Sequence, residues 1–136
     1  MNLRPFLLSL LVCMLSLTTA ACGKNTVSLG QEFTLQVGET ANIKGEKLQV
    51  KFLEVLEDSR CPKGVTCVWE GRVSCMIEIT YRESLHRITL TQPGLTDWPT
   101  EESFKEYQIS FGVEPYPEAG KEIPADDYLL LLRITK

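Results

Sequence analysis

Apolar and polar residues alternate along much of the chain with the two-residue period of half-buried β-strands. Phe33, Leu35 and Val37 share one parity, with polar residues between them. Residues 48–55 continue this pattern, but the apolar phase changes near Phe52. The change predicts a β-bulge at that point, or a strand that is buried on both faces.

The second half of the chain predicts four more strands, over residues 73–81, 86–90, 107–113 and 129–134. The last of these is apolar at nearly every position, so we expect a central strand with both faces covered. Residues 100–106 come nearest to a helical pattern, and we expect at most a short helix there.

Turn-forming pairs separate these segments, as they do in sandwiches and small barrels. The pairs are Gly38-Glu39, Gly45-Glu46, Glu70-Gly71, Pro93-Gly94 and Ala119-Gly120. We therefore predict one all-β domain over residues 32–136. Its expected architecture is a single antiparallel β-sandwich of the immunoglobulin-like kind, or a small barrel.

The N-terminus has the order of a secretion signal. A short start with Arg4 precedes an apolar stretch, Phe6–Leu17, and small residues follow up to Ala21. The apolar stretch has 12 residues, whereas a membrane-spanning helix needs roughly 20. We therefore assign residues 1–21 to a lipoprotein signal peptide.

The signal ends in Thr19-Ala20-Ala21-Cys22-Gly23, which resembles the lipobox of bacterial lipoproteins. The resemblance implies that Cys22 carries a diacylglyceryl anchor, and we interpret residues 22–31 as this lipidated cysteine and a short tether. The alternative is ordinary cleavage, which releases a soluble protein with a spare thiol. On the first interpretation the domain lies outside the cytoplasm in the bacterial cell envelope, held firmly to a membrane by two or three acyl chains.

Charge argues against some kinds of partner. Removing residues 1–21 leaves 115 residues with 13 basic and 18 acidic side chains, a formal charge of −5. A mildly acidic chain with no run of Lys or Arg argues against nucleic-acid binding. It also offers no polybasic segment for anionic lipids, so we expect membrane attachment to depend on Cys22 alone.

Three cysteines remain once Cys13 leaves with the signal and Cys22 is lipidated. They are Cys61, Cys67 and Cys75. An oxidising compartment makes a disulfide the expected state, and three cysteines allow three pairings.

We favour a disulfide between Cys61 and Cys67, because Pro62 and Gly64 can fold the intervening loop back on itself. A crosslink that closes about seven residues stabilises a fold by roughly 2 kcal/mol. The alternative pairs Cys67 with Cys75 across a short hairpin. On the favoured pairing Cys75 is a buried free thiol that shares the parity of neighbouring core positions.

The segment Asp58-Ser59-Arg60-Cys61-Pro62 is followed by Cys67-Val68-Trp69 and then by Gly71. This pattern resembles the signature of a group of exported bacterial domains, many of them predicted lipoproteins, that have no assigned function. The resemblance implies a similar fold and transfers no activity.

Residues of this segment also have structural roles that follow from their chemistry. Asp58 and Arg60 have opposite charges and are expected to pair beside the disulfide loop. We expect the Trp69 indole to pack over the disulfide, and Gly71 to adopt a backbone conformation that other residues resist.

The sequence contains no catalytic or cofactor motif. Its one histidine, His86, shares the parity of Ile88 and Leu90, so we expect it to be a packing residue. Phosphate-binding glycine loops, dinucleotide fingerprints and nucleophile elbows do not occur, and the cysteine spacing does not match a zinc knuckle. We therefore predict no catalytic residue, no metal, no cofactor and no enzymatic activity.

Two functional hypotheses remain. The first is a non-catalytic binding module that contacts an envelope protein or a glycan through loops at one end of the domain. Its candidate binding loop contains Pro115, Tyr116 and Pro117, where prolines stiffen the backbone around a tyrosine that we expect to be exposed. The second hypothesis is a redox or metal-handling protein that uses the three cysteines of the mature chain.

Overall fold

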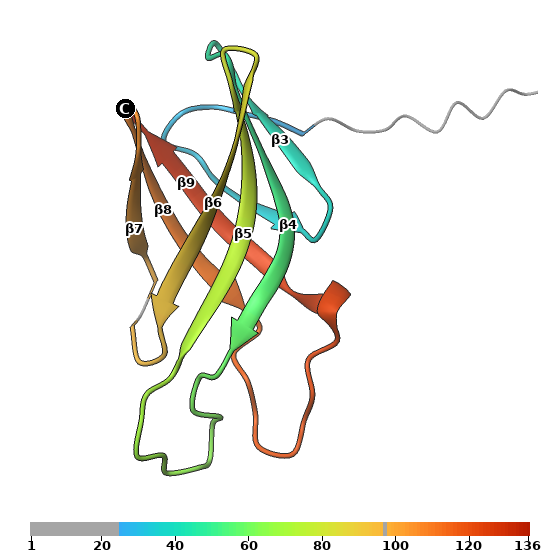
Figure 1. The fold of residues 1–136 in the computed structure, drawn as a ribbon, viewed down its shortest axis with the longest axis vertical. Helices are drawn as coiled ribbons and strands as arrows, with labels where there is room; N and C mark the ends of the chain where they lie inside the picture. Colours follow the sequence, from blue (N-terminus) through green and yellow to red (C-terminus); the bar gives the residue numbers. More distant parts are fainter. Residues whose placement is uncertain (1–24, 97) are drawn as a thin grey trace, which may run out of the picture.

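The computed structural model describes residues 25–96 and 98–136, and this part of the chain is built mainly of β-strands (Figure 1). In chain order the elements are β1 (Asn25–Val27), β2 (Glu32–Gln36), β3 (Thr40–Ile43), β4 (Leu48–Asp58), β5 (Arg72–Tyr81), β6 (Ser84–Pro93), β7 (Thr100–Phe104), β8 (Tyr107–Glu114), the 3₁₀ turn η1 (Ala125–Asp127) and β9 (Leu129–Thr135). Within the described ranges no helix is long and apolar enough to cross a bilayer.

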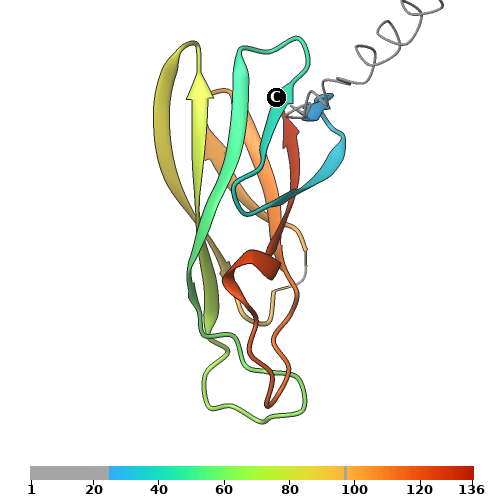
Figure 2. The same cartoon turned by 90° about the vertical axis from the view of Figure 1, so that its right-hand side faces the viewer.

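The strands form two sheets that pack against each other (Figure 2). One sheet has the order β1-β3-β4-β5-β6, and the other has the order β2-β9-β8-β7. Neighbouring strands are antiparallel except β1 and β3, which run parallel. The sheets do not close into a barrel, so the structure confirms the predicted sandwich over its small-barrel alternative.

The core lies between the two sheets and follows the parity of the strands. The largest fully buried side chains are Phe52, Phe111, Leu35, Ile77, Ile79, Leu90, Ile109, Leu130, Leu132, Ile134, Val50 and Val73. Burying an aliphatic or aromatic side chain of this size stabilises a fold by about 1.5–3 kcal/mol. β9 contributes three of these side chains and lies between β2 and β8, which confirms the predicted central position of the last strand.

β4 contains the predicted bulge. Its register against β5 shifts between Phe52 and Glu54, and it shifts again between Val55 and Glu57. Bulges bend a strand and increase its twist. β4 is accordingly curved as it descends toward the long loop that carries Cys61 (Figure 1).

The short helix expected over residues 100–106 is not formed. Thr100–Phe104 is strand β7, and Lys105 and Glu106 make the turn to β8. Phe104 is buried and pairs directly with Tyr107. Pairing and burial on the sheet therefore outweigh the local helical preference of the Glu-rich sequence.

Residues 25–31, expected to belong to a tether, are part of the sandwich. Asn25–Val27 is strand β1, and Val27 is buried. The backbone N–H of Gly30 donates to the carbonyl oxygen of Ile134 at 2.8 Å. Backbone pairing and one buried valine thus extend the domain toward the N-terminus, while Cys22 and the predicted signal lie outside the described residues.

The long axis of the sandwich separates two ends of different construction (Figure 1). One end consists of the tight turns 44–47, 82–83 and 105–106 together with Lys136, and it is termed the turn end. The opposite end consists of residues 59–71, 93–96 and 115–128, which are mostly long loops, and it is termed the clasp end. The segments that the sequence singled out for function belong to the clasp end.

Candidate functional site

A disulfide between Cys61 and Cys67 closes the first loop of the clasp end, as predicted, with Cα atoms 5.9 Å apart. Cys75 lies on β5, is fully buried and is a free thiol. Burial raises the pKa of the Cys75 thiol to about 12. This thiol therefore stays protonated at neutral pH, and the alternative Cys67–Cys75 pairing is wrong.

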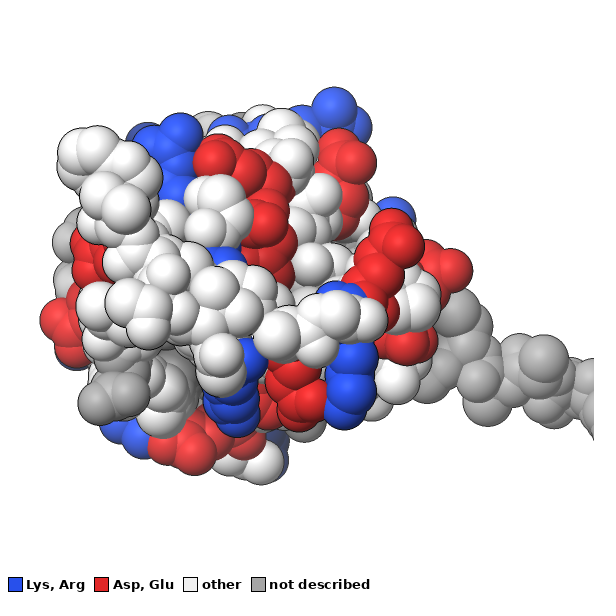
Figure 3. All heavy atoms as spheres, turned by 90° about the horizontal axis from the view of Figure 1, so that it is seen from below, with Lys and Arg blue, Asp and Glu red and all other residues white. Residues whose placement is uncertain are grey.

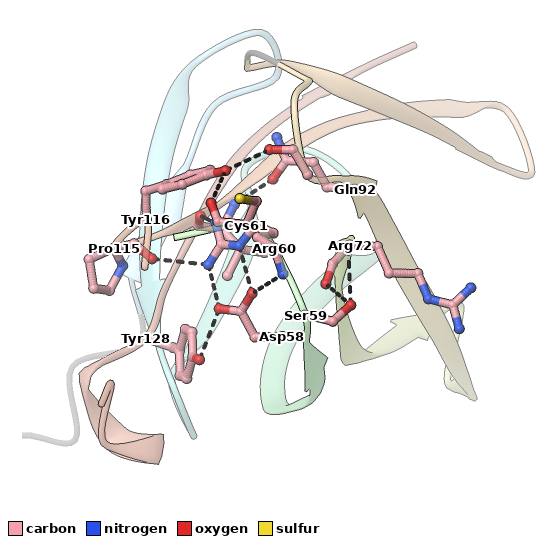
Figure 4. A network of polar contacts seen from close by, with 11 residues as sticks. Asp58, Ser59, Arg60, Cys61, Arg72, Gln92, Pro115, Tyr116 and Tyr128 are labelled. Carbon is pink, nitrogen blue, oxygen red and sulfur yellow. Dashed lines mark hydrogen bonds and ion pairs between the residues drawn. The ribbon is translucent and has the colours of Figure 1, made fainter. Parts of the chain in front are cut away.

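Arg60 joins the end of β4 to the end of β8 (Figure 4). Its guanidinium donates to both carboxylate oxygens of Asp58, at 2.8 Å from Nε and 2.6 Å from Nη2. It also donates to the carbonyl oxygens of Val113, at 2.8 Å, and Pro115, at 3.0 Å. The predicted ion pair is thus present and nearly buried, with side chains 3% and 9% exposed, and its bidentate geometry is the strong form of this interaction.

Tyr128, directly before β9, joins the same ion pair. Its hydroxyl donates to Oδ2 of Asp58 at 3.0 Å. Burial, together with the Asp58 carboxylate, raises the pKa of Tyr128 to about 12. Asp58 therefore connects β4 to both ends of the second long loop, through Arg60 on one side and Tyr128 on the other.

Tyr116 is a half-buried part of this network, so the expectation that it is exposed is wrong. Its hydroxyl donates toward the carbonyl oxygens of Cys61, at 2.8 Å, and Gly94, at 3.1 Å. The Arg60 guanidinium and the Lys63 ammonium lie 5.1 and 5.7 Å from the centre of its ring. Tyr116 is held inward because the folded disulfide loop supplies partners that lie far away in the sequence.

Backbone hydrogen bonds also join the two long loops. The N–H of Lys63 donates to the carbonyl oxygen of Pro117 at 3.0 Å, and the N–H of Ala119 donates back to the carbonyl oxygen of Lys63 at 3.3 Å. Of the predicted binding loop, Pro115 therefore supplies a carbonyl to Arg60 and Pro117 supplies one to Lys63. Both prolines help to fix the loop.

Two glycines allow the backbone to pack closely at this end. Gly71 has a φ of 69°, as expected for a position that other residues resist, and a Cβ there would lie 1.8 Å from the carbonyl oxygen of Ser59. A Cβ on Gly94 would lie 2.0 Å from the carbonyl oxygen of Glu70. The N–H of Gly94 donates to the carbonyl oxygen of Gly71 at 2.9 Å. Three chain segments thus meet through their backbones.

Four apolar side chains remain exposed on this fixed frame. Val68 is 90% exposed, Trp69 82%, Leu95 73% and Val65 48%. We expected the Trp69 indole to cover the disulfide, but it lies largely in solvent. The inward contacts of the loop are made by the loop backbone and by the Arg60 side chain. Figure 3 views the clasp end and shows a broad uncharged area beside acidic and basic side chains.

A groove of about 760 Å³ opens beside these residues. The disulfide loop, with Val65, forms one wall, and the chain after β6, with Leu95, forms another. Leu131 of β9 also lines the groove. Its volume is in the range of small-molecule sites.

His86 packs edge-on against Phe104, with ring centres 5.3 Å apart, as expected for a packing residue. In residues 25–96 and 98–136, no group of three or more His, Cys, Asp or Glu side chains is placed to hold a metal ion.

In comparisons with protein-family models, with curated proteins and with solved structures, no match to this chain was found. The resemblance of the segment around Cys61 and Trp69 to exported bacterial domains therefore stays a prediction.

Proposed function

We propose that the protein is a non-catalytic binding module of the bacterial cell envelope, anchored to a membrane through a lipid on Cys22. Its clasp end is the binding surface for an envelope protein. The observation that carries this proposal is the exposure of Val68 and Trp69, at 90% and 82%, on a loop that a disulfide closes. Soluble domains rarely leave clustered large apolar side chains in water unless a partner covers them.

The way in which the loop is held favours recognition. Ordering a flexible loop on binding costs free energy, and a loop that is already ordered avoids that cost. The contacts of Arg60, Tyr116 and Lys63 order this loop before any partner arrives. Tryptophan is also among the residues enriched at the positions that dominate binding energy at protein interfaces.

A protein partner fits the composition of this surface better than a glycan does. Aliphatic Val65, Val68 and Leu95 accompany the indole, and such side chains gain most when they are buried against other apolar groups. A sugar ring would gain from the aromatic face of Trp69 and leave the three aliphatic side chains poorly covered.

The redox alternative has less support. It needs Cys61, Cys67 and Cys75 to cooperate, and the structure separates them into a disulfide in a loop and a protonated thiol in the core. Exchange chemistry requires an accessible thiolate as attacking group. In the described part of the chain the free thiol is fully buried.

The test is a crosslinking pull-down from the native envelope with three baits, namely the intact lipoprotein, Trp69→Ser and Leu85→Ser. Leu85 is a matched control, because it is also an exposed apolar side chain, at 59%, but lies on β6 next to the turn end. We expect the intact bait and Leu85→Ser to capture the same partner. Trp69→Ser should recover at least about tenfold less of that partner. Equal recovery by all three baits contradicts the proposal.

Tyr116→Ala would be a poor bait for this purpose. The variant removes a hydroxyl that bonds to Cys61 and Gly94 as well as the ring beneath Arg60. A loss of binding would then mix a loss of loop order with a loss of contact. Trp69→Ser removes contact area alone, because the indole is almost wholly in solvent.

A further inference from the structure

The turn end gathers basic side chains that are widely separated in the sequence. They are Lys44, Lys47, Arg82, Lys105 and Lys136, and all are exposed. Three acidic residues share this end, namely Glu46, Glu83 and Glu106. Five basic against three acidic side chains give the turn end a side-chain charge of +2. The clasp end carries three basic and five acidic residues, a formal charge of −2.

Two of the turn-end carboxylates are drawn toward the protein. Glu46 accepts hydrogen bonds from the Tyr107 hydroxyl, at 2.5 Å, and from Lys136, at 3.1 Å. Glu106 accepts from the Tyr81 hydroxyl at 2.8 Å. The Glu46 and Glu106 side chains are only 19% and 34% exposed. The outermost surface of the turn end is therefore more basic than the residue count indicates.

Three lysines provide most of this outward charge. Within the described residues Lys44, Lys47 and Lys105 form no ion pair. They belong to two different turns, 44–47 and 105–106, which the hydrogen bond from the Tyr107 hydroxyl to Glu46 joins at this end. A surface that meets this end encounters unpaired ammonium groups first.

The chain enters the sandwich nearer to this end than to the clasp end. Asn25 of β1 lies opposite Ala41 of β3, which lies opposite Val50 of β4. From Val50, β4 runs eight residues further to Asp58, or about 26 Å at the rise of a β-strand. Cys22 precedes Asn25 by three residues, a reach of at most about 10 Å. An anchor on Cys22 therefore lies within about 10 Å of Asn25, which is in the half of the sandwich nearer the turn end.

We propose that the turn end lies against the anionic phospholipid headgroups of the bilayer, so that the clasp end points away from the membrane toward its partner. The inference rests on the proposed lipid anchor. Basic side chains close to an anionic leaflet are attracted to it, and the acidic clasp end is repelled. A charge of +2 is too small to recruit a free protein. The anchor already holds the domain at the surface, so only its orientation remains to be selected.

The test supplies the anchor chemically, by coupling Cys22 of the mature chain to a maleimide headgroup lipid in vesicles. The disulfide protects Cys61 and Cys67, and Cys75 is buried, so coupling is directed to Cys22. Energy transfer from tryptophan to dansyl-labelled headgroups then reports orientation. Both tryptophans of the chain are suitable donors, since Trp69 is in the clasp end and Trp98 lines its groove.

On phosphatidylglycerol vesicles we expect transfer to be lower by about twofold than on phosphatidylcholine vesicles, because the clasp end is held away from the surface. High salt should remove the difference, because it screens exposed charges. Equal transfer on the two lipids at low salt overturns the inference.

Two charge-reversal variants complete the test, each first checked for an unchanged melting temperature. Lys47→Glu/Lys105→Glu at the turn end should abolish the lipid dependence. Lys63→Glu/Lys121→Glu at the clasp end makes the same change in net charge, and this variant should retain the lipid dependence. If the two variants behave alike, the turn end does not determine the orientation of the domain on the membrane, and the inference fails. Lipidation in cells and partner capture through Trp69 are measured in separate experiments. Failure of the proposed function can therefore be distinguished from failure of the inferred orientation.

Discussion

The two ends of the sandwich use similar residue types and hold them in different ways. At the turn end, tight turns connect the strands. In the ion pairs Lys136–Glu46 and Arg82–Glu106 the basic side chains are 49% and 67% exposed, and pairs of this kind contribute little. At the clasp end, a disulfide closes the 13-residue loop 59–71. Arg60, in its nearly buried pair with Asp58, fastens that loop to the 14-residue loop 115–128 through the carbonyl oxygen of Pro115. Tight turns are fixed by their own backbone, whereas long loops need partners from elsewhere in the chain.

This difference explains why the clasp end is suited to binding. A long loop can present side chains such as Val68 and Trp69 well beyond the strands, but left unfastened it would lose order. The network around Arg60 orders the loop before binding, so binding does not have to pay the entropy of ordering it. The turn end has no loop of that length, and its contribution is a basic surface.

The largest effect is expected from Arg60→Met. The substitution leaves the Asp58 carboxylate buried without its cation, and breaking a buried pair in this way costs about 3–5 kcal/mol. Arg82→Met at the turn end removes an exposed partner and should change the unfolding free energy little. Urea denaturation of both variants provides the measurement. Asp58→Leu/Arg60→Met should recover part of the loss, because it removes the uncompensated charge. Equal small losses at Arg60 and Arg82 would contradict the comparison.

Gly71→Ala and Gly45→Ala compare backbone packing at the two ends. Both glycines have positive φ, of 69° and 79°, but only at Gly71 would a Cβ collide with backbone, 1.8 Å from Ser59. We expect Gly71→Ala to lower the unfolding free energy by about 3 kcal/mol or more. Gly45→Ala should lower it by about 1 kcal/mol, the cost of positive φ alone. Thermal unfolding followed by circular dichroism measures both, and a similar loss at the two sites would show that the clasp-end backbone can move apart.

Removing the disulfide should have a smaller effect. Cys61→Ser/Cys67→Ser frees the loop in the unfolded state, which costs about 2 kcal/mol of stability. Dithiothreitol applied to the unaltered protein should reproduce this loss, because Cys75 is buried and takes no part. At a temperature where the variant and the unaltered protein are both folded, we also expect the variant to capture less partner, because its loop is less ordered. Undiminished capture would show that the contacts of Arg60 and Tyr116 order the loop without the crosslink.

The alternation of residues predicted most of the fold. Phe52, Ile77 and Leu132 lie in the core as their parity indicates, and the bulge beside Phe52 appears where the apolar phase changes. The pattern does not predict β7 as a strand and allows at most a short helix there, because its one buried residue, Phe104, gives no alternating signal. β1 was missed for the same reason. A strand of three to five residues depends on its neighbours more than on its own sequence.

The candidate site was predictable only where its partners are close in sequence. The Cys61–Cys67 disulfide and the Arg60–Asp58 pair each join residues at most six apart, and both were predicted. Tyr116 was misplaced because its partner Cys61 is 55 residues away. The basic turn end could not be seen in a chain without runs of lysine, because the fold assembles it from separate turns.

The smallest expected effect is a difference in acid stability between the two ends. Glu46 at the turn end has a pKa below its ordinary value of 4.5, first because of the Tyr107 hydroxyl and then because of Lys136. Glu118 at the clasp end has a pKa lowered by Lys121. A lowered pKa in the folded state stabilises the protein above pH 4.5, and this stabilisation is lost as pH falls through the folded pKa.

Glu46 should account for more of the acid destabilisation than Glu118 does. Its side chain is 19% exposed against 48%, so its interactions are less screened, and it has two partners rather than one. Glu46→Gln should therefore flatten the fall in melting temperature between pH 7 and about pH 3 more than Glu118→Gln. Tyr107→Phe should flatten it as well, because it removes the first cause of the lowered pKa. A larger effect of Glu118→Gln would mean that the clasp end is the more pH-sensitive of the two.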